Sequence, residues 1–235
     1  MMQYRGDDDA GHFVRALFRV GAVCKSTNAG CAEQSLDQLE AILASAPRPP
    51  ALLSLSVHAF RALLVAQSAN SSARALGLLD RAGIVNEPDF ATAIDDAFRP
   101  GSGVLARTCP SSQPHFHNLY LGSMHVAADA YAALGDGRGA LRMVRRIVGH
   151  VRHCDAELAC GTLLACVTAL KLAGGGADID GALSLAMDLA RPSKALQIDV
   201  LRVLAGHLLD GHKKPIRRRG VPRSSEGAKG DQRAL

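Results

Sequence analysis

Residues 125–148 read HVAADAYAALGDGRGALRMVRRIV and predict two short amphipathic helices that meet at Gly135-Asp136. A small residue followed by Leu opens the second helix, at Ala140-Leu141. The same layout recurs three more times, at Ser35-Leu36, Ala75-Leu76 and Ala182-Leu183. Such helix pairs bury their apolar faces only against neighbouring pairs. The sequence therefore predicts an all-α fold, an α-solenoid of stacked helix-turn-helix repeats.

The four markers are 40, 65 and 42 residues apart, so the middle interval is too long for one repeat. We expect it to hold one helix near residues 87–98, capped by Asn86 with Pro88 in its first turn. An irregular segment should follow over about residues 99–114. The interval is either a degenerate repeat or an insertion.

Apolar residues recur at steps of three and four through residues 115–134, which is the pattern of one helix face. The next helix has two faces: its apolar side carries Leu141, Val144, Ile147, Val148 and Val151, and its other side carries Arg138, Arg142, Arg145 and Arg152. Residues 158–173 are apolar on nearly every side, as expected of a helix packed on both flanks. With 16 residues, this segment is shorter than the roughly 20 that span a bilayer.

One elongated domain is predicted over residues 11–211, and residues 1–10 and the basic tail 212–235 are expected to be disordered. Hydrophobic residues make up 48% of the chain, which suffices for a substantial core, whereas aromatic residues make up only 4% and Trp is absent. Tightly stacked helices with small residues do not need large aromatic side chains. The alternating runs typical of β-strands are almost absent.

Two stretches, AADAYAALGDGRGALRMVRRI and TALKLAGGGADIDGALSLAMDLA, resemble pentatricopeptide repeats, whose first helix ends in an apolar-small-Gly turn and whose second opens with Ala-Leu. The first stretch also resembles a tetratricopeptide repeat. SVHAFRALLVAQSANSSARALGLLDRAG and HFVRALFRVGAVCKSTNAGCAEQSLDQLEAILA extend the resemblance over residues 12–210. The unit is longer than the roughly 34 residues of such repeats.

Pentatricopeptide proteins bind single-stranded RNA in mitochondria or plastids, and each repeat reads about one base. The resemblance implies a base contact from a polar residue about ten positions before the turn glycine. Only His125 occupies such a position, because the other three are Val20, Phe60 and Leu164. We therefore expect contacts to the RNA backbone or shape, as in relatives built into organellar ribonucleoproteins.

Positive charge is concentrated in two places. Residues 212–235 hold eight basic and two acidic residues, which leaves 19 basic and 20 acidic residues in the rest of the chain. Residues 138–153 hold five arginines, two histidines and no acid. Forked guanidinium groups bind phosphate or carboxylate. Candidates for binding RNA or an acidic partner are therefore Arg138, Arg142, Arg145, Arg146 and Arg152 in the body and Lys213, Lys214, Arg217, Arg218 and Arg219 in the tail. A solvated helix face and a solvated tail are the alternative interpretations.

Motifs of hydrolases, zinc proteases and phosphate loops are missing, and the six cysteines form no C-x-x-C pair. We therefore expect no catalysis, no metal, no cofactor and no small-molecule substrate. His150, His153 and Cys154 lie close in sequence but lack a second pair of ligands. Most thiols should be buried as small hydrophobes in a reducing compartment. Asp178 or Asp180 is expected to cap a helix ahead of Ala182.

The leading hypothesis is a non-catalytic helical-repeat protein in RNA metabolism, a component of an organellar ribonucleoprotein whose partners are RNA or other subunits. The alternative is a tetratricopeptide-like scaffold that binds protein segments. The start, MMQYRGDDDAGHF, has no apolar run of signal-peptide length, so neither secretion nor membrane association is expected. A mitochondrial or plastid location follows from the resemblance alone, and a cytoplasmic one is the alternative.

Overall fold

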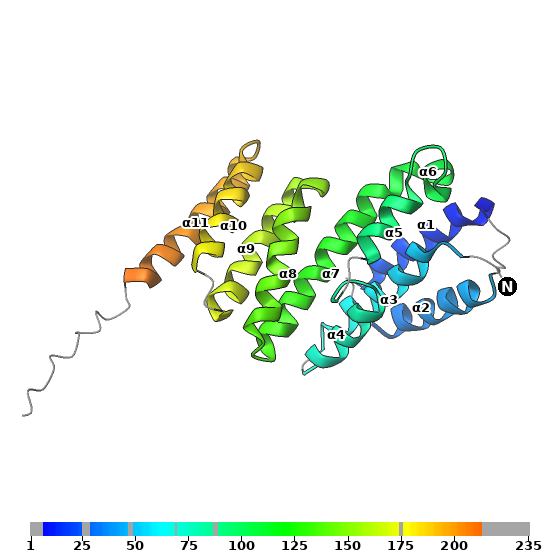
Figure 1. Ribbon diagram of the computed structural model, residues 1–235, viewed down its shortest axis with the longest axis horizontal. Helices are drawn as coiled ribbons and strands as arrows, with labels where there is room; N and C mark the ends of the chain where they lie inside the picture. Colours follow the sequence, from blue (N-terminus) through cyan, green and yellow to red (C-terminus); the bar gives the residue numbers. More distant parts are fainter. Residues whose placement is uncertain are drawn as a thin grey trace, which may run out of the picture.

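The computed structural model describes residues 7–24, 29–46, 49–68, 70–86, 89–173 and 176–212. Within these ranges the chain is all-helical and contains no strand, which confirms the predicted all-α class (Figure 1). The helices are α1 (Asp7–Cys24), α2 (Ala29–Ala44), α3 (Ala51–Val65), α4 (Ser72–Arg81), α5 (Asp89–Ala97), α6 (Val104–Thr108), α7 (Gln113–Ala133), α8 (Gly137–His150), α9 (Ala156–Ala173), α10 (Gly176–Ala190) and α11 (Lys194–His212), with short 3₁₀ helices η1 (Pro110–Ser112) and η2 (Val151–His153).

Most of the helices pack as consecutive antiparallel pairs, α1 with α2, α3 with α4, α7 with α8 and α9 with α10. The first helix of each pair also packs on the first helix of the next, from α1 through α3, α7 and α9 to α11. The second helix of each pair packs on the first helix of the following pair. Figure 1 shows the four helix pairs side by side in chain order, with α11 at one end.

Two short helices, α5 and α6, lie in the long interval that the sequence left open. The α5 helix packs on α3 and α7, and α6 packs on α1. Because α3 and α4 still pack directly on α7, these two helices lie beside the row of pairs and do not interrupt it. Residues 99–114, expected to be irregular, include α6, η1 and the first turn of α7.

Glycines end two helices where the chain needs a left-handed residue. Gly135 has φ +77°, and the Asp136 N–H donates to the Tyr131 carbonyl at 2.9 Å, which closes a Schellman motif after α7. Gly83 has φ +63° and forms the same motif after α4, where the Ile84 N–H donates to the Leu79 carbonyl at 3.0 Å. The turn predicted at Gly135-Asp136 is thus confirmed.

The side chains that form the core change from aromatic in the first helix pairs to small or aliphatic in the last. All six phenylalanines lie between residues 13 and 116. Phe18 and Phe116 meet edge to face at 5.0 Å between ring centroids, and Phe90 stacks on Tyr120 at 5.5 Å. Beyond α8 the buried side chains are mostly small or aliphatic, such as Cys160, Cys166, Ala182, Ala186 and Ala190.

Helix boundaries differ from the expectation at two places. The α1 helix begins at Asp7, inside the stretch expected to be disordered, because apolar packing already starts at the fully buried Ala10. The α10 helix begins at Gly176, so Asp178 lies in its first turn and does not cap a later start.

The α9 helix packs on α7, α8, α10 and α11, as its all-round apolar character predicts. No helix among the described residues is long and apolar enough to cross a membrane. The tail beyond His212 lies outside the described residues.

Candidate functional site

The α8 helix carries the predicted arginines on a face opposite its buried side. The Asp136 side chain caps its start, since Oδ1 accepts a hydrogen bond from the Gly139 N–H at 2.9 Å. Its inner side buries Ala140, Met143, Val144 and Ile147. The outer side borders an open hollow of about 450 Å³ that is lined by Arg138, Leu141, Arg142, Arg145 and Arg146. We call these five residues the arginine surface. The α8 helix itself contains no acidic residue.

Arg146 differs from the other arginines because its side chain is partly buried and tied to neighbouring segments. Its Nη1 donates to the carbonyls of Ile84 at 2.5 Å and Val85 at 3.3 Å, just after α4. Its Nη2 donates to the Tyr120 hydroxyl on α7 at 2.6 Å. Arg146 therefore joins three segments of the fold, and only part of its guanidinium faces the hollow.

Arg142 and Arg138 present their charges more openly. The Arg142 Nη2 donates to the Tyr131 hydroxyl at 3.2 Å, and its guanidinium carbon lies 5.7 Å from the centre of the Tyr131 ring. Four of the five N–H groups of Arg142 remain for a ligand. Arg138 is exposed and makes no hydrogen bond or ion pair with any described residue.

Arg145 forms a forked pair with Asp178 in the first turn of α10. The guanidinium Nε donates to Oδ1 at 3.0 Å, and Nη2 donates to Oδ2 at 3.3 Å. The hydrogen bond to Asp178 raises the pKa of the Arg145 guanidinium above its usual value, and the carboxylate charge adds to this. Sequence reasoning missed Asp178 as part of this site, because it lies 33 positions from Arg145 and its own neighbourhood indicated a helix cap.

The other predicted residues lie elsewhere. Arg152 is exposed on η2 and does not line the hollow. His125 lies on α7 with Nε2 3.3 Å from the Asp129 carboxylate one turn away. The predicted tail residues Lys213, Lys214, Arg217, Arg218 and Arg219 lie outside the described residues.

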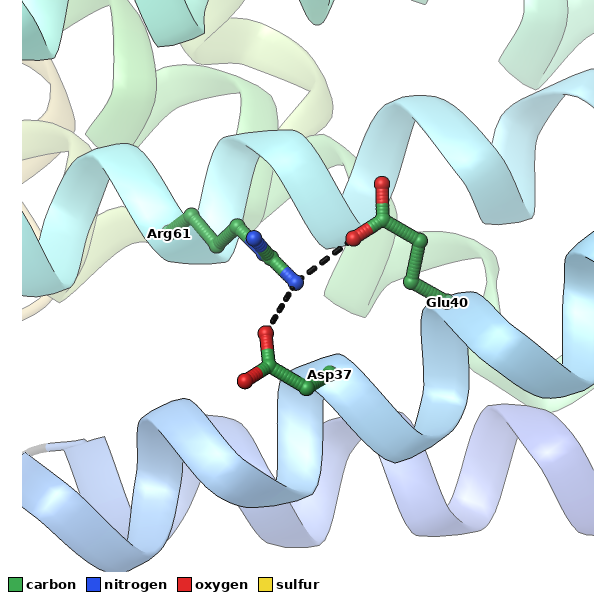
Figure 2. Close-up of polar contacts among 3 residues, drawn as sticks. All are labelled: Asp37, Glu40 and Arg61. Atoms are coloured by element: carbon green, nitrogen blue, oxygen red, sulfur yellow. Dashed lines mark hydrogen bonds and ion pairs between the residues drawn. The ribbon is translucent and has the colours of Figure 1, made fainter.

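Arg61 provides a contrast with α8, because acids neutralise it (Figure 2). Its Nη2 lies 2.5 Å from Asp37 Oδ1 and 2.6 Å from Glu40 Oε2. Both acids are on α2, so this arginine joins α2 to α3, and its side chain is only 25% exposed. Among the residues that the structure describes, Arg138, Arg142 and Arg145 together contact a single carboxylate, that of Asp178.

Three histidines gather where α7 starts and α8 ends, and we call His117, His150 and His153 the histidine cluster. His117 Nδ1 lies 3.2 Å from His150 Nε2, and the three ring centroids are 5.1 to 5.4 Å apart. Burial, followed by the charges of His117 and His153, lowers the pKa of His150 to about 4. Burial also lowers the pKa of His117, and His153 lowers it further, whereas Asp95 raises it.

The histidine cluster includes His117, which lies 33 positions before His150 and which no sequence pattern connects to His150 and His153. The rings of His117 and His153 stack with an interplanar angle of 25°, so their in-plane nitrogen lone pairs do not converge. Among the described side chains no group of three or more His, Cys, Asp or Glu could hold a metal ion.

The cysteines with described side chains are free thiols of varied exposure. Cys160 and Cys166 are buried, Cys109 and Cys154 are half-buried, and Cys31 is exposed. Burial raises the pKa of Cys154 to about 11 and that of Cys166 to about 12. These two thiols therefore stay protonated and unreactive at neutral pH.

Comparison with known proteins yields no relative. No protein-family description, no curated protein and no solved structure matches this chain.

Proposed function

We propose that this chain is a non-catalytic α-solenoid of pentatricopeptide-like type that acts in RNA metabolism, with the arginine surface of α8 binding RNA phosphates. The observation that carries the proposal is the open hollow of about 450 Å³ with four guanidinium groups around Leu141. Guanidinium forks bind phosphate oxygens in pairs, and phosphate contacts supply most of the sequence-independent affinity for nucleic acid.

The order of helix contacts supports the solenoid part of the proposal. In stacked repeats each pair contacts only its neighbours, and here the first helices touch along the row while each second helix touches the next pair. The α8 helix is the second helix of its pair, so the arginine surface lies on the layer away from the first helices. An RNA strand bound there would lie on the outside of the stack. The arginines would contact its phosphates and would not read its bases one by one.

The parent assembly is part of the same proposal. A surface that binds phosphates without reading bases suits a subunit of a ribonucleoprotein, where folded RNA presents backbone to many proteins. The resemblance to pentatricopeptide repeats favours an organellar ribonucleoprotein of mitochondria or plastids. The basic tail would add further phosphate contacts.

Anisotropy of a labelled random single-stranded RNA pool tests the proposal, with the full chain at about 50 and about 200 mM salt. Reversing two charges, Arg138→Glu with Arg142→Glu, should weaken binding at least tenfold. The slope of log affinity against log salt should become shallower by about 1.4, the value for two lost single-strand phosphate contacts. Reversing Arg191 and Arg202 is the matched control, because both are exposed arginines paired only with an Asp three residues before them.

A second variant separates the body from the tail, with Lys213, Lys214, Arg217, Arg218 and Arg219 changed to Gln. The proposal expects this variant to keep salt-sensitive RNA binding that still depends on Arg138 and Arg142. Loss of all binding in the tail variant, beside an unchanged helical spectrum, would refute an RNA surface on α8.

One observation favours the tetratricopeptide-like scaffold as a second candidate. The outer side of α11 exposes four large apolar side chains, Ile198, Leu201, Leu208 and Leu209, each at least 50% exposed. Exposed apolar groups along one helix are typical of protein–protein contacts. Binding through them would depend on apolar anchors and change little with salt, which is the opposite of the RNA result.

A further inference from the structure

The carboxylate of Asp178 meets the arginine surface in the way a bound phosphate would. Two N–H···O contacts, at 3.0 and 3.3 Å, join Arg145 to the two oxygens of Asp178. This fork is the geometry by which arginine also recognises a phosphate with two free oxygens. Two of the five N–H groups of Arg145, on Nε and Nη2, are therefore already in use, and the carboxylate compensates its charge.

Asp178 is also the only described acid that contacts the arginine surface. The hollow itself is lined by four arginines and Leu141. Arg146 is held by backbone carbonyls and a hydroxyl, and Arg142 by a hydroxyl, so neither of these contacts neutralises a charge. Among Arg138, Arg142, Arg145 and Arg146, only Arg145 has its charge compensated within the described part of the chain.

We infer that Asp178 is a built-in competitor that occupies Arg145 until an RNA phosphate displaces it, so that binding at the arginine surface releases the first turn of α10 from α8. This inference rests on the proposed function. The Arg145 side chain is 64% exposed and that of Asp178 27%, so water and ligand reach the pair without unfolding.

A phosphate can displace Asp178 from Arg145 readily, because ion pairs between side chains as exposed as these are weak. An exposed ion pair shifts an equilibrium constant by at most a factor of about five. The Nε and Nη2 donors of Arg145 are then free at least about one-sixth of the time, and the apparent affinity falls in proportion to this free fraction. Removing the competing carboxylate should therefore tighten RNA binding by up to about sixfold.

The test measures equilibrium binding of a labelled single-stranded oligouridine to the full chain at low salt. Asp178→Asn keeps the shape of the side chain but removes its charge and the second acceptor of the fork. The matched control is Asp180→Asn, which removes one charge from the same turn of α10. Asp180 faces α11, where its Oδ1 lies 3.6 Å from His207 Nε2.

We expect RNA binding to tighten between about twofold and about sixfold for Asp178→Asn and to change less than about twofold for Asp180→Asn. In an Arg145→Gln background, which itself weakens binding, Asp178→Asn should have no effect, because the group it frees is gone. Helical spectra of all variants should superimpose.

The outcomes separate the two claims. If the wild-type chain binds no oligouridine, or Arg145→Gln leaves its binding unchanged, the proposed RNA surface on α8 fails, and the competitor role fails with it. A second outcome is that the wild-type chain binds oligouridine and Arg145→Gln weakens this binding, while Asp178→Asn and Asp180→Asn have equal effects. The RNA surface on α8 then stands, and the competitor role of Asp178 is refuted. Equal tightening by Asp178→Asn with and without Arg145 would also refute it, because the effect would then be one of overall charge.

Discussion

Adding one methyl group to α8 should have opposite effects on stability at its two ends. A Cβ at Gly139 would lie 2.5 Å from Tyr131 Cδ1 and 2.6 Å from Asp136 Oδ2. A Cβ at Gly149, on the same helix, would have no neighbour within 4 Å. We therefore compare Gly139→Ala with Gly149→Ala.

The magnitudes follow from three contributions. Overpacking of this kind costs about 1–3 kcal/mol. Displacement of Asp136 loses a helix cap, which costs about 1 kcal/mol. Alanine in place of glycine in a helix regains up to about 1 kcal/mol. Gly139→Ala should thus destabilise the chain by about 2 kcal/mol, whereas Gly149→Ala should stabilise it by up to about 1 kcal/mol.

Urea unfolding followed by far-UV circular dichroism measures both variants. With a slope of about 2 kcal/mol per molar urea, the midpoint of Gly139→Ala should fall by roughly 1 M. The midpoint of Gly149→Ala should stay or rise. If Gly139→Ala is as stable as the wild-type chain, Tyr131 and Asp136 can yield without cost, and the assignment of Gly139 as a required close contact is refuted.

Three further predictions concern the surroundings of the arginine surface. Arg146→Met should destabilise the chain by about 2 kcal/mol in urea unfolding, because the carbonyls of Ile84 and Val85 lose their charged donor. Stability should fall as the pH drops from about 6.5 towards 4. The pKa of His150 is about 4 in the folded chain, so the unfolded chain, where this pKa is about 6.5, binds a proton at His150 before the folded chain does. Leu208→Ser should change the free energy of unfolding by less than about 0.5 kcal/mol, because this side chain is 56% exposed.

Each of these predictions has its own contrary result. Arg138→Met is the control for Arg146→Met, and equal stability of the two variants would show that the carbonyl contacts contribute nothing. For the pH effect, thermal unfolding of His150→Gln should depend less on pH between 6.5 and 4. An unchanged pH profile in that variant would contradict the role of His150. A loss above 1 kcal/mol in Leu208→Ser would mean that the outer side of α11 is packed.

Local patterns were sufficient to predict the helices and the turn around α8. The three- and four-residue spacing through α7 and the glycine at 135 are properties of neighbouring residues, and the structure has the helix ends where they predict. The count of charges over residues 138–153 grouped Arg146 with Arg138, Arg142 and Arg145, because a charge count does not show which side chains neighbouring segments cover. The chain segment that covers Arg146 follows α4, about 60 positions earlier.

The partners within the candidate site depend on contacts that no local pattern contains. Asp178 and Arg145 are 33 residues apart, and so are His117 and His150. Arg145 and Asp178 meet because consecutive helix pairs lie against each other, whereas His117 and His150 meet because α7 and α8 pack together within one pair. The start of α10 was misplaced for a related reason, since a Gly-rich stretch and two aspartates indicate a turn and a cap, whereas packing on α9 extends the helix back to Gly176.

The uneven distribution of phenylalanine gives the two ends of the chain different resistance to local opening. Aromatic rings anchor α1, α3 and α7, whereas α10 and α11 are held by smaller side chains and follow a run of glycines. Backbone amides of α10 and α11 should therefore exchange with solvent hydrogen before those of α3 and α7. The arginine surface lies on α8, at the border between the two regions. Fraying from the C-terminal end would separate Asp178 from Arg145 while the arginines stay in place on a folded support.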